Sequence, residues 1–76
     1  MKIDTLPIGL YDENIYILHE NDKVLIIDPG NHGDKIIDKI NKNEKVQGIL
    51  ITHGHYDHAH HARMVADAFG VSVYAS

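Results

Sequence analysis

Short apolar runs, separated by polar and turn-forming residues, mark the first half of the chain. They predict strands at residues 2–8, 15–19 and 24–27. Pro7 confines the first strand to an edge or terminal position, because proline donates no ladder hydrogen bond. The turn between the second and third strands has Asn21-Asp22 at its centre, and these residues tolerate the left-handed backbone of a tight hairpin. We therefore expect those two strands to pair antiparallel.

The pattern in the second half changes to an alternation of helix and strand. Asp34 can cap a short amphipathic helix that turns Ile36, Ile37 and Ile40 to one side. The apolar run at 46–52 indicates a buried strand. A second helix, starting near Asp57 or His58 and ending at Gly70, is predicted from apolar residues at helical spacing, namely Ala62, Val65, Ala66 and Phe69. A last strand begins at 71–74.

This order of elements predicts an α/β fold, with antiparallel strands first and then helix, strand, helix and strand. The later strands should be parallel, with helices covering at least one face of the sheet. The alternation stops two residues after Tyr74, while one face of the proposed sheet is still uncovered. We therefore expect residues 1–76 to form a single incomplete domain, which predisposes the chain to self-association.

Composition excludes several classes of protein. No stretch approaches the roughly 20 apolar residues that cross a bilayer, so we expect no membrane partner. Asp4 and Pro7 stand where a signal peptide would have its apolar segment, which favours a cytoplasmic location. The net charge of −4, with scattered lysines, argues against nucleic-acid binding by this segment. The absence of cysteine excludes disulfides and thiolate metal sites.

The segment Thr52-His53-Gly54-His55-Tyr56-Asp57-His58 concentrates three imidazoles and a carboxylate directly after the predicted buried strand. These groups bind Zn²⁺, iron or Mn²⁺ near neutral pH. Side chains alternate in an extended loop, so His53 and His55 can reach one ion. Asp57 and His58 lie at the turn into the helix and suit a second ion or an incoming water. Gly54 lets the backbone bend closely around the site.

Two such ions would lower the pKa of a bridging water to near neutrality and polarise a carbonyl or phosphoryl oxygen. Asp57 could accept a proton or hold the nucleophile, which makes hydrolysis the natural reaction class. A hydrolytic site needs about three protein ligands for each ion, and this segment offers two for each. The remaining ligands are missing from the local motif.

The segment resembles the His-x-His-x-Asp-His signature of the metallo-β-lactamase superfamily, and the match is complete. The upstream run that ends in Asp28-Pro29-Gly30 is similar to the first motif of the same superfamily, especially of its glyoxalase II-like hydrolases. The resemblance implies the N-terminal part of an αββα sandwich. It also implies two Zn²⁺ ions, with iron or manganese as alternatives, and cleavage of a thioester, lactone or similar small-molecule ester by metal-bound hydroxide.

The resemblance also assigns roles to individual residues. His53 and His55 would bind the first metal ion, and Asp57 and His58 the second. Asp57 would be catalytic as well, by orienting the nucleophilic water, and Asp28 would support the site without binding an ion itself. Further ligands lie downstream in the family, so we expect this chain alone to be inactive. Relatives often have two glycines after the last histidine of the signature, where this chain has Ala59-His60-His61-Ala62.

Other interpretations of these residues remain open. The histidines could be an exposed tract that binds metal incidentally, Asp57 a helix N-cap, and Asp28 part of a common strand-ending turn. His60 and His61 are expected on the helix surface, and no function is assigned to His19 or His32. The whole chain could instead be an autonomous metal-binding or interaction module that completes its site by oligomerisation, or a relative of phosphodiesterases that act on RNA.

Overall fold

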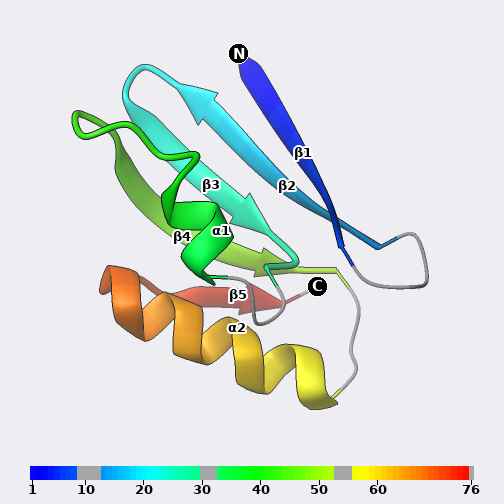
Figure 1. The fold of residues 1–76 in the computed structure, drawn as a ribbon. Coiled ribbons are helices and arrows are strands. Elements are labelled where there is room, and N and C mark those ends of the chain that lie inside the picture. The colour runs from blue at the N-terminus through cyan, green and yellow to red at the C-terminus, as the bar shows by residue number, and fades with distance from the viewer. Residues whose placement is uncertain (9–12, 30–32, 53–55, 76) are drawn as a thin grey trace.

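The computed structural model describes residues 1–8, 13–29, 33–52 and 56–75, which form one mixed sheet with two helices (Figure 1). The elements are β1 (Lys2–Ile8), β2 (Glu13–Glu20), β3 (Lys23–Ile27), α1 (Gly33–Ile37), β4 (Lys45–Ile51), α2 (Tyr56–Phe69) and β5 (Val73–Ala75). The strands lie side by side in the order of the sequence, β1-β2-β3-β4-β5. No helix within these ranges is long and apolar enough to span a membrane.

The first three strands form an antiparallel meander. β1 lies at the edge of the sheet, as the proline at position 7 predicted. β2 and β3 are joined by a tight turn in which Asn21 and Asp22 have φ angles of 51° and 64°. Positive φ at both central residues is the geometry of the favoured hairpin turns. The predicted hairpin is therefore confirmed.

The second half of the sheet is parallel. β4 pairs parallel with β3, and β5 pairs parallel with β4. Each parallel step is connected through a helix, α1 before β4 and α2 before β5, because parallel neighbours need a crossover connection. α2 ends in a Schellman motif: the Gly70 N–H donates to the Asp67 carbonyl at 3.2 Å, and the Val71 N–H donates to the Ala66 carbonyl at 3.0 Å.

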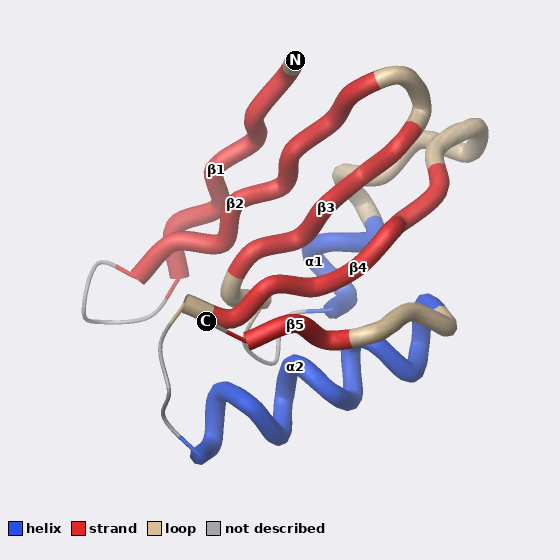
Figure 2. The backbone as a smooth tube through the Cα atoms, turned by 180° about the vertical axis from the view of Figure 1, so that it is seen from behind, coloured by secondary structure: helices blue, strands red, loops and turns tan. Residues whose placement is uncertain are grey.

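One face of the sheet carries the core, and both helices pack on it (Figures 1 and 2). The buried apolar residues are Ile15 and Ile17 of β2, Val24 and Ile26 of β3, Ile36 of α1, Ile49 and Ile51 of β4, and Ala62, Val65 and Ala66 of α2. The strand residues among them alternate with residues of the opposite face, as the period of two requires. On that opposite face the side chains of Tyr16 and Tyr74 are exposed.

The first helix differs from its prediction. α1 begins at Gly33, so Asp34 is its second residue and does not precede it as a cap. The helix is one turn long and gives way after Ile37 to bonds of the tighter 3₁₀ type, from the Lys39 N–H to the Ile36 carbonyl (2.9 Å) and from the Ile40 N–H to the Ile37 carbonyl (3.2 Å). Ile36 is buried, but the Ile37 side chain is 54% exposed, so the predicted inward position of Ile37 is wrong.

Candidate metal centre

Two connections meet at one end of the parallel part of the sheet. β3 and β4 run in the same direction, so the residues that follow them, Asp28 and Thr52, lie at the same edge. The Asp28 N–H donates to the Leu50 carbonyl at 2.9 Å, which extends the parallel ladder one residue beyond β3. Asp28 has a φ of 53°, a left-handed conformation that aspartate tolerates better than most residues, and the buried Pro29 follows it.

The carboxylate of Asp28 accepts two hydrogen bonds from Thr52. The Thr52 backbone N–H donates to Oδ1 at 2.8 Å, and the Thr52 hydroxyl donates to Oδ2. Hydrogen bonds to an ionised carboxylate are among the stronger ones in proteins. Thr52 is followed directly by His53, the first predicted metal ligand. The Asp28–Thr52 contact therefore fixes the point from which the histidine loop leaves the sheet.

The structure describes the predicted metal ligands only in part. His53 and His55 lie outside the described residues. Asp57 and His58 are the second and third residues of α2, and their side chains also lie outside the description. α2 starts at Tyr56, so Asp57 belongs to the first turn of the helix and not to the position before it. The histidine loop thus spans the connection from Thr52 to the start of α2.

The rest of α2 is anchored firmly beside this connection. Ala62, Val65 and Ala66 are buried against the sheet. Gly33, at the start of α1, also lies against α2, since a Cβ at this position would be 3.6 Å from Cγ2 of Val65. The side chains of His60 and His61, two positions and one position before Ala62, lie outside the described residues, so their expected surface position stays a prediction.

The donor set of the segment suits a metal ion. Within the ranges that the structure describes, no three histidine, aspartate or glutamate side chains are grouped to hold one. The predicted metal site rests on the chemistry of His53, His55, Asp57 and His58, whose nitrogen and oxygen donors fit Zn²⁺, iron and manganese alike. The Asp28–Thr52 contact would give such a site the outer support that metal-binding loops commonly have.

Reasoning from the sequence missed Thr52 as the partner of Asp28. A signal was present, because Asp28 follows one predicted strand and Thr52 ends another, each before a βα connection, and the carboxyl ends of parallel neighbours meet at one edge. Sequence reasoning also left His19 without a role, although the structure buries it between two carboxylates.

Comparisons with known proteins agree on one family. The sequence model of the metallo-beta-lactamase superfamily matches residues 8–76. A protein of Streptococcus pyogenes named as a probable metallo-hydrolase is 48% identical over 70 residues, which are 91% of this chain and 30% of that protein. The hydroxyacylglutathione hydrolase GloC of Haemophilus influenzae is 31% identical over 78 residues, which cover 100% of this chain and 37% of that enzyme.

A solved structure matches in the same way. The crystal structure of the B3 metallo-beta-lactamase BLEG-1 superposes with a TM-score of 0.76 at 31% identity, covering 96% of this chain and 36% of that one. The chain thus spans about a third of the length of the relatives it matches. The mixed sheet with two helices confirms the predicted fold class, that of the corresponding part of the metallo-β-lactamase fold. With the histidine signature inside the matched region, these findings show that the chain belongs to the metallo-β-lactamase superfamily.

Proposed function

We propose that this chain carries a metal-binding segment of a hydrolase that cleaves a thioester, lactone or related ester. The observation that carries the proposal is the double hydrogen bond from Thr52 to Asp28, which holds the residue before His53 by both its backbone and its side chain. Such a contact is the outer support that a metal-binding loop would need at its first residue. Membership of a superfamily of hydrolases supplies the reaction class.

The roles of the residues follow from their chemistry. A divalent metal ion supplies Lewis acidity and makes a water molecule acidic near neutral pH. His53 and His55 would bind the first ion, and Asp57 and His58 would bind the second. Asp57 would also orient the attacking water and accept its proton. Asp28 keeps the histidine loop in position through Thr52.

The substrate class is the finer part of the proposal. A relative with 31% identity is named a hydroxyacylglutathione hydrolase, and an acyl group joined to glutathione is a thioester. The sequence Asp28-Pro29-Gly30 adds the resemblance to glyoxalase II-like enzymes. A small acyl thioester is therefore the substrate to test first.

The segment provides two donors for each ion, where a catalytic site commonly has about three protein ligands. We therefore expect the 76-residue chain to bind Zn²⁺ weakly and to hydrolyse no thioester by itself. The additional ligands would come from other parts of a full-length protein, in keeping with the share of its relatives that this chain covers.

The test is a Zn²⁺ titration of the purified chain, with a hydroxyacyl-glutathione thioester assay on the same samples. The variants are His53→Ala and Asp57→Ala. The control is Asp67→Ala, which removes an exposed carboxylate near the other end of α2. We expect both site variants to lose Zn²⁺ binding and the control to keep it. Binding that survives in His53→Ala and Asp57→Ala would place the metal elsewhere, and turnover by the chain alone would contradict the expected need for further ligands.

A further inference from the structure

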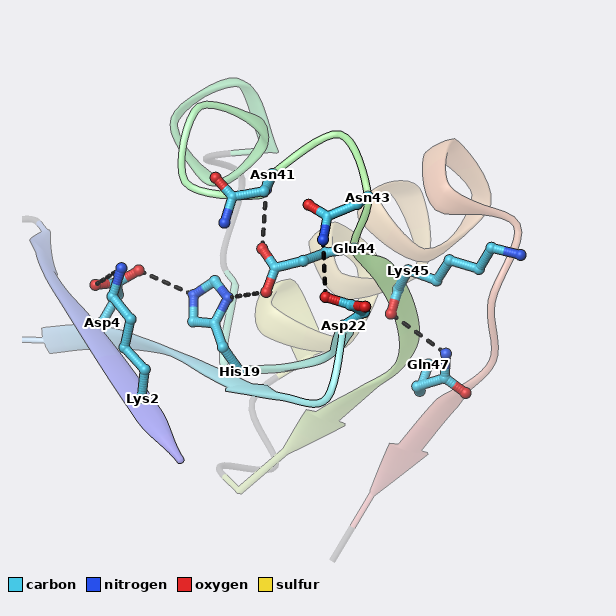
Figure 3. A network of polar contacts seen from close by, with 9 residues as sticks. All are labelled: Lys2, Asp4, His19, Asp22, Asn41, Asn43, Glu44, Lys45 and Gln47. Carbon is cyan, nitrogen blue, oxygen red and sulfur yellow. Dashed lines mark hydrogen bonds and ion pairs between the residues drawn. The ribbon is translucent and has the colours of Figure 1, made fainter.

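Figure 3 shows a second polar cluster. It lies at the end of the sheet opposite to Asp28 and Thr52. Its centre is His19, near the end of β2, whose side chain is only 7% exposed. Buried imidazoles need partners for both ring nitrogens, because an unpaired polar atom in the interior costs free energy. The proposed metal chemistry makes no use of this histidine.

Both nitrogens of His19 face carboxylates. Nε2 lies 2.9 Å from Oδ2 of Asp4 on the edge strand β1, and Nδ1 lies 2.7 Å from Oε2 of Glu44, in the turn before β4 (Figure 3). The Glu44 side chain is also only 7% exposed. His19 therefore connects three segments that are 15 and 25 residues apart in the sequence.

The turn that holds Glu44 is itself well tied down. The other carboxylate oxygen of Glu44, Oε1, accepts the Asn41 N–H at 2.9 Å, and the Glu44 N–H donates to the Asn41 carbonyl at 3.0 Å. The Asn43 amide donates to Asp22 at 2.8 Å, which links the turn to the β2–β3 hairpin. The Asn41 N–H and then the His19 ring lower the pKa of Glu44 below its ordinary value of 4.5. Glu44 is thus ionised and in a fixed position.

Ionised carboxylates only accept hydrogen bonds, so both ring nitrogens of His19 must donate to satisfy this arrangement. Only the doubly protonated imidazolium does so. A neutral ring would point a nitrogen lone pair at one of the two carboxylates. Lys2 is a further charged group beside the cluster, with Nζ 4.0 Å from Oδ1 of Asp4, whereas β3 places the apolar Val24 next to His19.

We propose that His19 is a protonation-dependent clamp, whose imidazolium form holds the edge strand β1 and the turn at 41–44 against β2. When the ring loses a proton, one of its two contacts becomes repulsive, and β1 or the turn loses an attachment. Glu44 must be ionised to accept a hydrogen bond from the charged ring, so its contribution to stability is lost as pH falls through its lowered pKa.

The direct test is the protonation state of the ring in the unmodified chain. Long-range proton–nitrogen NMR spectra at pH 7.5 report both ring nitrogens of each histidine, and His19→Gln identifies the signals of His19. We expect protons on both nitrogens of His19. A single protonated nitrogen would overturn the proposal. The protonation state itself is measured on the wild type, and the variant serves only to assign the signals of His19.

A second test measures stability against pH. Urea unfolding of the wild type and Glu44→Gln is followed at pH 6.5 and pH 9, with a chelator present to keep metal off the other histidines. The control is Asp67→Asn, which removes the same charge at an exposed position of α2. We expect the folding constant of the wild type, relative to Glu44→Gln, to fall on the order of tenfold between the two pH values, since bonds to charged groups contribute that much. The proposal would be overturned if the ratio of the folding constants of the wild type and Glu44→Gln were the same at both pH values. It would also be overturned if the ratio of the wild type to Asp67→Asn changed by the same factor.

Discussion

At the scale of single residues, Thr52 lies directly before His53 and provides two hydrogen-bond donors to Asp28. Any residue except proline could offer Asp28 a backbone N–H at position 52, but the second bond needs a hydroxyl. A β-branched residue also suits the end of a strand, because its side chain has few rotamers. Threonine combines both properties, and it lies directly beside the proposed ligand His53.

Replacing the hydroxyl by a methyl group, Thr52→Val, should weaken Zn²⁺ binding by the chain about 10-fold to 100-fold, the usual effect of losing an outer partner of a metal ligand. Thr52→Ser keeps the hydroxyl and should bind close to the wild type. Competition with a chromophoric chelator measures the affinities, and urea unfolding without metal shows whether the fold survives. Equal affinity for Thr52→Val and Thr52→Ser would mean that the Asp28–Thr52 contact serves the fold alone.

At the scale of elements, the end of α2 depends on one glycine. Gly70 has a φ of 69° within the Schellman motif, and a Cβ added there would come within 4 Å of no described residue beyond its chain neighbours. Among the described residues, steric contact therefore adds no cost to the substitution. What remains is the backbone penalty of a left-handed conformation for a residue that has a Cβ.

Gly70→Ala should accordingly destabilise the chain by about 1 kcal/mol, and Gly70→Asn by less, since asparagine adopts this conformation more readily. Urea unfolding monitored by circular dichroism gives both values. Ser72→Ala, at an exposed position two residues later, is the control. A Gly70→Ala variant as stable as the wild type would show that the helix can end in another way.

At the scale of the whole molecule, the two faces of the sheet differ. The helices cover one face, and the other presents apolar side chains in register across neighbouring strands, in the row Tyr16, Ile27, Leu50 and Tyr74. Tyr74 is 58% exposed. Contiguous apolar surface of this kind favours association. We therefore propose that isolated copies of this chain pair through the open face.

Sedimentation velocity over a range of concentrations should show a reversible dimer of the wild type. The double variant Tyr16→Lys and Tyr74→Lys should remain monomeric, because a charge on this face would be buried on pairing. The matched control is Met64→Lys on α2, where an equally exposed apolar side chain (59%) lies away from the open face. A monomeric wild type, or a dimer that only Met64→Lys disrupts, would contradict pairing through this face.

The sequence predicted most of the fold, because most of it depends on local signals. The turn at Asn21-Asp22 and the helix end at Gly70 are positions where a few adjacent residues decide the backbone conformation. Ile37 shows the limit of such reasoning. Its spacing from Ile40 suggested one apolar face, but the helix ends at Ile37, so the periodicity does not continue.

By itself the sequence determined the order of strands and helices, the donor set from His53 to His58 and the family signature, since these depend on residues close together in the chain. Only the tertiary structure decided that Thr52 holds Asp28 and that His19 lies between Asp4 and Glu44. These partners are 15 to 25 residues apart, and no local preference specifies them. They meet because the hydrophobic face of the sheet sets the register of its strands, and that register brings distant polar groups together.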